Sequence, residues 1–151
     1  PDFPLNQDRY RGARILVTGP NFGCGSSREG AVYTLLDSGF RVLIAPSFGD
    51  IFAANCMKNG VLTITLPEAT VAELRDELAA AAEPCLTVDL AAQKITRPGG
   101  ETLAFFPEPF QKHCLINGLN EIDLSLEFAA EIDAFEAAHR ARMPWLLSRE
   151  G

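Results

Sequence analysis

The chain has 151 residues, of which 47% are hydrophobic, and this predicts a single globular domain over residues 1–151 with a substantial core. Its formal net charge is −7 and it contains no cluster of lysine and arginine, which argues against nucleic acid as a partner. No apolar run approaches the roughly 18 residues of a membrane span, so no membrane partner is expected.

Strand and helix patterns alternate in the first part of the chain. Apolar runs at 13–18, 41–46 and 61–66 predict strands, and amphipathic stretches at 27–38 and 47–59 predict helices between them. Gly39 and Gly60 are well placed to end these helices, and Ser47 to cap the second one at its N-terminus. Successive strands joined by single helices form a parallel sheet, so the predicted fold class is α/β, with a parallel core sheet and flanking helices.

The second part of the chain predicts a different arrangement. A helix over 68–83 precedes short strands within 85–90, 94–97 and 101–106, which form a hairpin-rich segment. Two further helices are expected at 107–117 and 124–142. In the last helix the spacing of Phe128, Ile132 and Phe135 predicts that these side chains point inward.

The four cysteines indicate neither disulfides nor a metal site. Cys24, Cys56, Cys85 and Cys114 are scattered, and no two form a CxxC pair. A domain of this size does not need disulfides, so we expect a reduced, cytoplasmic protein with Cys56 and Cys114 as small core residues. Without paired spacing we expect no metal ligands in this chain.

The most informative stretch is the glycine-rich segment at 19–30, GPNFGCGSSREG. It follows the first predicted strand and leads into the first predicted helix, where backbone N–H groups and the helix dipole favour an anion. Ser26, Ser27 and Arg28 stand where the loop becomes helix. We interpret this loop as the binding site of a carboxylate substrate, with one serine taking part in proton transfer.

Other interpretations of the loop are a tight turn with a serine cap, or a nucleotide site. A phosphate-binding P-loop would require a Gly-Lys-Ser/Thr sequence, and this stretch has no lysine. A dinucleotide fingerprint would require glycine at position 28, which is Arg28 here. The nucleotide motifs therefore fit poorly, whereas the turn alone remains open on local chemistry.

Four segments carry a resemblance to a known family: NFGCGSSRE at 21–29, IAPSFGDIF at 44–52, NCMKNGVL at 55–62 and KHCLINGLNEIDLSL at 112–126. They closely resemble the small subunit of 3-isopropylmalate dehydratase, the detached swivelling domain of the aconitase superfamily. The resemblance implies a swivelling β/β/α domain that forms a heterodimer with a large subunit. It also implies a [4Fe–4S] cluster on that large subunit, none in this chain, and a role in leucine biosynthesis in the cytoplasm.

The resemblance also implies roles for residues of the loop. Ser26 corresponds to the base that removes the carbon-bound proton, and Ser27 and Arg28 to residues that bind the carboxylates of a small dicarboxylate substrate. The backbone around them, at Gly23, Cys24 and Gly25, belongs to the same substrate-binding loop. A serine is a poor base unless its alkoxide is stabilised, and a helix N-terminus with an adjacent guanidinium can supply that stabilisation.

The chain departs from the family pattern at two places. Gly30 stands where the family usually has histidine, and the sequence starts without an upstream segment that carries an Asp-Thr-Asp motif in the family. We therefore expect either a truncated chain or a divergent paralogue. Two alternatives stay open: a related hydratase acting on citraconate-like or dimethylmaleate-like acids, and a non-catalytic binding or assembly domain of the same fold.

Overall fold

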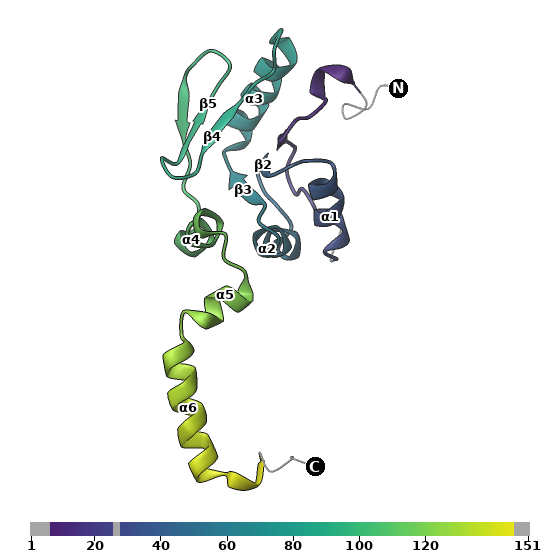
Figure 1. The fold of residues 1–151 in the computed structure, drawn as a ribbon. Helices are drawn as coiled ribbons and strands as arrows, with labels where there is room; N and C mark the ends of the chain where they lie inside the picture. Colours follow the sequence, from purple (N-terminus) through teal and green to yellow (C-terminus); the bar gives the residue numbers. More distant parts are fainter. Residues whose placement is uncertain (1–6, 26–27, 147–151) are drawn as a thin grey trace. The chain divides into compact units, whose positions relative to one another are not determined.

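The computed structural model describes residues 7–25 and 28–146. The chain divides into two compact units, residues 1–118 and 119–151. The larger unit holds the sheets and the helices from α1 to α4, and the smaller unit is helical (Figure 1). The larger unit also begins with a short 3-10 helix, η2 (Asp8–Tyr10).

A parallel sheet forms the centre of the larger unit. Its strands are β1 (Ile15–Val17), β2 (Val42–Ala45) and β3 (Leu62–Thr65), in the order β1-β2-β3. Both pairs of neighbours are parallel, and Leu43 lies opposite Leu16 on one side and Thr63 on the other. The parallel core sheet predicted from the sequence is therefore confirmed.

Apolar clusters lie on both faces of this sheet. On one face Leu43 packs with Val32 of α1 (Gly30–Asp37) and Phe52 of α2 (Asp50–Lys58). On the other face Ile44 packs with Leu74 of α3 (Glu68–Ala80) and belongs to a second cluster. Strands covered on both faces need continuous apolar runs, which explains why these three were recognisable in the sequence.

Three short strands make a second, antiparallel sheet. They are β4 (Thr87–Asp89), β5 (Lys94–Thr96) and β6 (Thr102–Ala104), paired in chain order. The sheet contributes Ile95 to the cluster that contains α3, and Arg97 lies 2.8 Å from Glu77 and 3.2 Å from Glu73 of that helix. The hairpin-rich segment is thus fixed onto α3, and the helix α4 (Pro109–Asn117) follows it.

Two predicted helix starts need correction. The sequence pattern predicts that the first helix begins at residue 27, but α1 begins at Gly30 with Glu29 as its N-cap residue. It also predicts Ser47 as the cap of the second helix, but Gly49 occupies that position, and the Ser47 hydroxyl contacts Asn21 in the preceding loop instead. A hydroxyl that can cap a helix can equally bond a neighbouring loop, and local sequence does not distinguish the two.

The smaller unit contains α5 (Glu121–Leu126), α6 (Ala129–Arg142) and a short 3-10 helix, η3 (Pro144–Leu146). Asn120 and Asp123 form a reciprocal capping box that starts α5. The sequence predicts that Phe128, Ile132 and Phe135 point inward, but they are 59%, 42% and 65% exposed. That prediction is wrong because helical spacing identifies an apolar face without showing what covers it.

Within the described residues, no helix has both the length and the apolar character needed to cross a membrane. Cys56 and Cys114 are buried, as expected for small core residues. Cys24 and Cys85 are exposed.

Candidate active site

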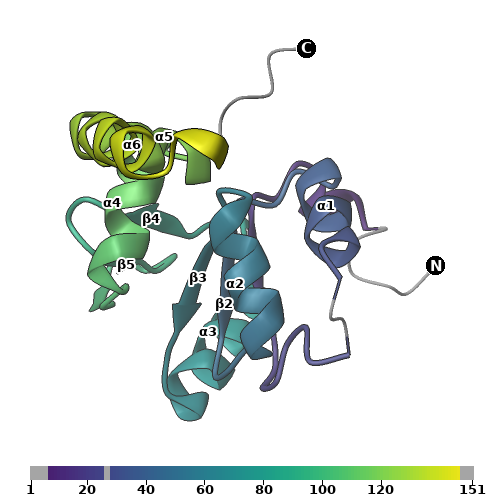
Figure 2. The same ribbon diagram turned by 90° about the horizontal axis from the view of Figure 1, so that it is seen from below.

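The glycine-rich loop begins at the carboxyl end of β1, and the segment 46–49 begins at the carboxyl end of β2. Because β1 and β2 are parallel neighbours, both segments emerge at the same edge of the sheet. Each leads into a helix on the same face, α1 after the first and α2 after the second (Figure 2). The candidate site is therefore built from two adjacent strand-to-helix connections.

Four hydrogen bonds join these two connections. The Asn21 amide donates to the Ser47 hydroxyl at 2.8 Å, and that hydroxyl lies 3.2 Å from the Asn21 side-chain oxygen. The Phe22 amide donates to the Ser47 carbonyl at 3.0 Å, and the Gly49 amide donates to the Phe22 carbonyl at 2.9 Å. Asn21 has a φ of 54°, so the backbone enters the loop in the left-handed region. Sequence reasoning missed this contact because it assigned Ser47 to helix capping.

Packing also holds the loop against the start of α2. Gly23 has a φ of 78°, and a Cβ atom at this position would lie 2.2 Å from Cγ of Phe52. A Cβ atom on Gly49 would lie 2.9 Å from Cα of Cys24. The Phe22 and Phe52 rings meet edge to face at 5.5 Å. Two glycines are thus required where the loop backbone touches α2, and they fix its path before the predicted catalytic residues.

The structure places the predicted site residues in three groups. Gly23 is half-buried against α2, whereas Cys24 and Gly25 are exposed just beyond it. Ser26 and Ser27 lie outside the described residues. Arg28 is exposed, and Glu29 and Gly30 follow it at the start of α1. The described residues on either side of the serines therefore connect the surface beside α2 to the N-terminus of α1.

The start of α1 carries a further polar contact. The Tyr33 hydroxyl donates to a Glu29 carboxylate oxygen at 2.8 Å. This hydrogen bond and the nearby negative charge raise the pKa of Tyr33 above its usual value, so the phenol stays protonated near neutral pH. The contact spans one turn of α1 and orients the Glu29 side chain next to Arg28.

The described residues contain no group of three or more histidine, cysteine, aspartate or glutamate side chains that could hold a metal ion. Burial raises the pKa of the Cys56 thiol to about 12, so this group is a neutral thiol at physiological pH. Cys56 therefore packs as a core residue, and it is a poor candidate for a metal ligand or a nucleophile.

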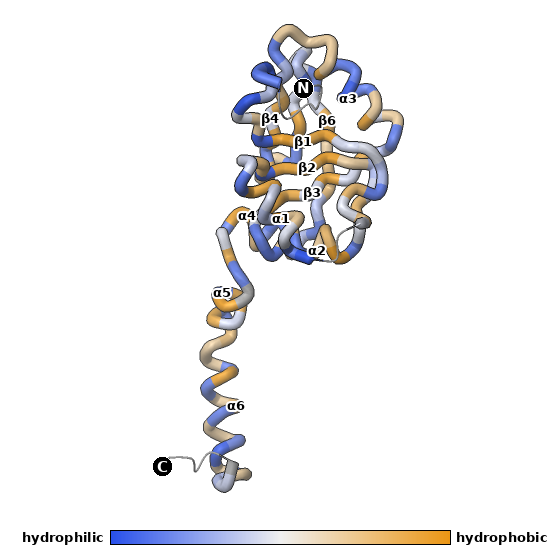
Figure 3. Tube along the Cα trace, turned by 90° about the vertical axis from the view of Figure 1, so that its right-hand side faces the viewer, coloured by the Kyte–Doolittle hydropathy of each residue, from blue (hydrophilic) through white to orange (hydrophobic). Residues whose placement is uncertain are grey.

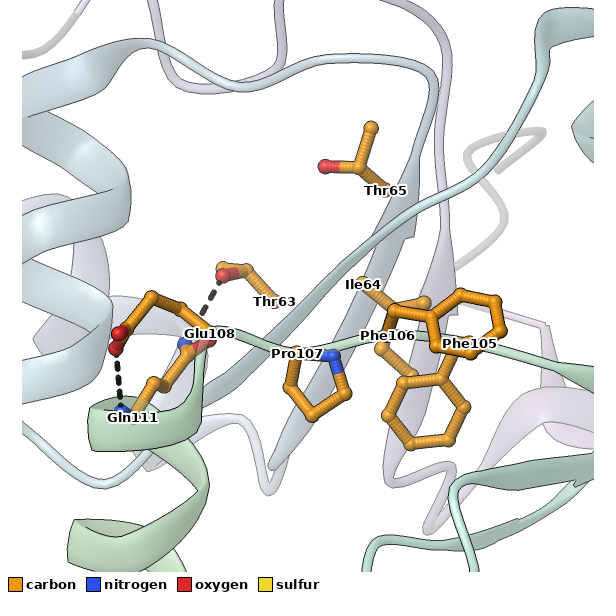
Figure 4. Close-up of a pocket in the computed structure, with 8 residues that line it drawn as sticks. All are labelled: Thr63, Ile64, Thr65, Phe105, Phe106, Pro107, Glu108 and Gln111. Carbon is orange, nitrogen blue, oxygen red and sulfur yellow. Dashed lines mark hydrogen bonds between the residues drawn. The ribbon is translucent and has the colours of Figure 1, made fainter.

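A separate hollow of about 170 Å³ lies beside β3. The Gln111 side chain of α4 donates to the Thr63 hydroxyl at 3.3 Å, and the Gln111 backbone amide donates to the Glu108 carboxylate at 2.9 Å (Figure 4). None of the residues that line this hollow belongs to the glycine-rich loop. The predicted site residues and this hollow are thus different features of the larger unit.

Three family models match successive parts of the chain. Residues 1–69 match a model described as the aconitase C-terminal domain, and residues 72–106 match one described as LeuD_N. Residues 121–149 match a model that describes the C-terminal domain of the 3-isopropylmalate dehydratase small subunit. The aconitase match contains the whole glycine-rich loop.

Curated proteins and a solved structure show the same similarity. The 3-isopropylmalate dehydratase small subunit of Dinoroseobacter shibae is 57% identical over 146 residues, covering 97% of this chain and 73% of that protein. The small subunit of Methylibium petroleiphilum is 56% identical, covering 97% of this chain and 68% of that protein. A crystal structure of 3-isopropylmalate dehydratase (leuD) from Methanocaldococcus jannaschii superposes with a TM-score of 0.58 at 27% identity, covering 81% of this chain and 68% of that one. These matches confirm the resemblance and the fold class inferred from the sequence motifs.

Proposed function

The chain belongs to the family of 3-isopropylmalate dehydratase small subunits, and from this premise we propose that it is the small subunit of a hydro-lyase. The reaction is the interconversion of 2-isopropylmalate and 3-isopropylmalate by dehydration and rehydration, in leucine biosynthesis. The observation that supports this most directly is the glycine-rich loop, which is held against α2 by Ser47 and Gly49 and leads into the N-terminus of α1.

In the proposed mechanism Ser26 removes the carbon-bound proton of the substrate. The N-terminus of α1 and the Arg28 guanidinium favour negative charge at this place, so they stabilise both the serine alkoxide and the substrate carboxylates. Ser27 and Arg28 bind those carboxylates, and Gly23, Cys24 and Gly25 supply the backbone that surrounds them. A guanidinium suits this task because its planar fork can donate two parallel hydrogen bonds to one carboxylate.

The partner in this proposal is the large subunit of the dehydratase. The described part of this chain offers no set of metal ligands, and we assign the [4Fe–4S] cluster to the large subunit. When bound there, the cluster supplies a Lewis acid for the hydroxyl that leaves the substrate. We also propose that residues 1–151 act as one swivelling domain in the cytoplasm, with both compact units attached to the same partner.

One observation keeps a related substrate as the second candidate. A Cβ atom at Gly30 would meet nothing within 4 Å, so the position next to Glu29 and Arg28 is open where the family usually has histidine. An altered side chain here could favour a citraconate-like or dimethylmaleate-like acid. The complex with the large subunit should be assayed on all three substrate classes. We expect the highest kcat/KM for isopropylmalate, and a higher value for either other acid would assign the chain to the related hydratase.

Replacing Arg28 with lysine should weaken substrate binding. Lysine keeps the positive charge but loses the planar fork, so the expected loss is on the order of 1.5–3 kcal/mol of binding free energy. The measurement is KM and product inhibition for the variant complex, with Arg28→Ala as the reference for complete loss. If lysine performs as well as arginine, the site needs only a positive field and the two-point contact is wrong.

Two substitutions at Gly30 should separate helix stability from substrate handling. Gly30→Ala should stabilise α1 by up to about 1 kcal/mol with little effect on kcat/KM, because alanine is the better helix former. Gly30→His should leave the fold intact, since the space is open, and should raise activity on isopropylmalate. Thermal unfolding and kcat/KM are measured for both variants. A loss of several kcal/mol of stability in Gly30→His would show that the backbone requires glycine.

A further inference from the structure

The smaller unit presents an apolar stripe along α6. Ile132 and Phe135 lie three residues apart on one helix face and are 42% and 65% exposed. Phe128 just before the helix and Trp145 just after it are 59% and 68% exposed. Apolar and polar residues alternate along this helix, as the colours of Figure 3 show. We call Phe128, Ile132, Phe135 and Trp145 the apolar stripe.

The helix that carries the stripe lacks a core of its own. None of the described side chains of α6 is buried, whereas the shorter helix α2 buries Phe52 and Cys56. An isolated helix of about 14 residues is only marginally stable in water, because most helical stability in proteins comes from packing an apolar face. The physical expectation is therefore that another surface covers the apolar stripe.

We infer that the apolar stripe is the surface through which this chain docks on the large subunit. The inference rests on the proposed function. Its support is that residues 121–149 match a family model of their own, described for the small subunit, while the loop-bearing residues 1–69 match the aconitase C-terminal domain. The stripe therefore belongs to the part of the chain by which these small subunits are recognised, outside the part that holds the candidate active site.

The side chains around the stripe define what the partner must provide. The helical period places Glu131 and Asp133 on opposite sides of Ile132, and both are exposed. Phe135 and His139 stack at 5.6 Å and line a hollow of about 280 Å³ together with Ala138 and Arg142. Nδ1 of His139 is buried in this arrangement without a hydrogen-bond partner. The matching surface is an apolar groove with basic residues on its rim and one side chain that enters the hollow and bonds the imidazole.

The test titrates the large subunit against the full small subunit and its variants, with turnover of isopropylmalate as the readout. Phe135→Asp should raise the concentration of large subunit needed for half-maximal activity by roughly 10- to 100-fold, because it removes a large apolar contact. The kcat at saturating large subunit should stay within about twofold, since the stripe holds no catalytic residue. Ile132→Ser is a second variant that should shift the titration in the same direction.

Ala134→Asp is the matched control. Ala134 is the exposed neighbour of Phe135 and faces the other side of α6, so the same new charge there should leave the titration unchanged. Equal binding by wild type and Phe135→Asp would overturn the inference while leaving the proposed function intact. Failure of wild type to bind the large subunit at all would overturn both.

Two further outcomes would assign the stripe to another surface and overturn the inference. Sedimentation and thermal unfolding of the isolated small subunit distinguish them. If Phe135→Asp dissociates a homodimer, with an unchanged large-subunit titration, the stripe binds a second copy of this chain. If the substitution instead lowers the melting temperature of the isolated monomer by several degrees, the stripe packs on the chain's own larger unit.

Discussion

Replacing Ser26 with alanine in the complex with the large subunit should lower kcat by roughly 10²–10⁴, the usual range for loss of a general acid or base. KM should change much less, because the hydroxyl acts mainly in the transition state. The measurement is steady-state kinetics of the variant complex, with binding to the large subunit checked by the same titration as for wild type. A fall in kcat with unchanged binding would place Ser26 in the chemical step.

Ser27→Ala is the matched control for this prediction, since it removes the same group one residue further on. Its effect should appear mainly in KM, because the proposed role of Ser27 is to bind a substrate carboxylate. If Ser26→Ala is close to wild type while Ser27→Ala is inactive, the two serines have exchanged roles. Similar small effects in both variants would contradict serine catalysis in this loop.

Replacing Gly23 with alanine should have the largest structural effect on the site. The new methyl group would lie 2.2 Å from Cγ of Phe52, at a backbone φ of 78° that disfavours side chains. Overpacking and the left-handed backbone together should cost roughly 2–4 kcal/mol of unfolding free energy. Chemical denaturation of the isolated chain measures this loss, and the activity of the complex should fall because the loop is displaced from α2.

Gly25→Ala provides the comparison for Gly23. A Cβ atom at Gly25 would meet nothing within 4 Å, and its φ lies outside the left-handed region. The free energy of unfolding should therefore change by less than about 1 kcal/mol. If Gly23→Ala is as stable as Gly25→Ala, the close contact between the loop and Phe52 does not exist in solution.

Much of the fold was predictable because it depends on strong local patterns. Val42 to Ala45 form an apolar run that is covered on both faces, and Gly118 ends α4 with a φ of 64°, as glycine does at helix ends. The motif around Arg28 also identified the family from a short stretch of sequence. These features depend on residues that are close together in the chain.

The misread features depend on contacts between distant residues. Ser47 precedes a helix, and its role as a hydrogen-bond partner of Asn21 becomes visible only when the two strand-to-helix connections are placed side by side. Likewise, the need for glycine at position 23 comes from the ring of Phe52, which lies far along the chain on the next helix. For Phe135, the helical period gave the apolar face correctly, but the covering surface is not encoded in that period.

The most direct test of the proposed function measures isopropylmalate turnover by this chain, by the large subunit, and by their mixture. We expect neither subunit to turn over substrate alone, because the base is on one chain and the cluster on the other. Activity should rise with added large subunit and level off near equal amounts of the two chains. Turnover by this chain after rigorous removal of the large subunit, or full turnover by the large subunit without it, would contradict the proposal.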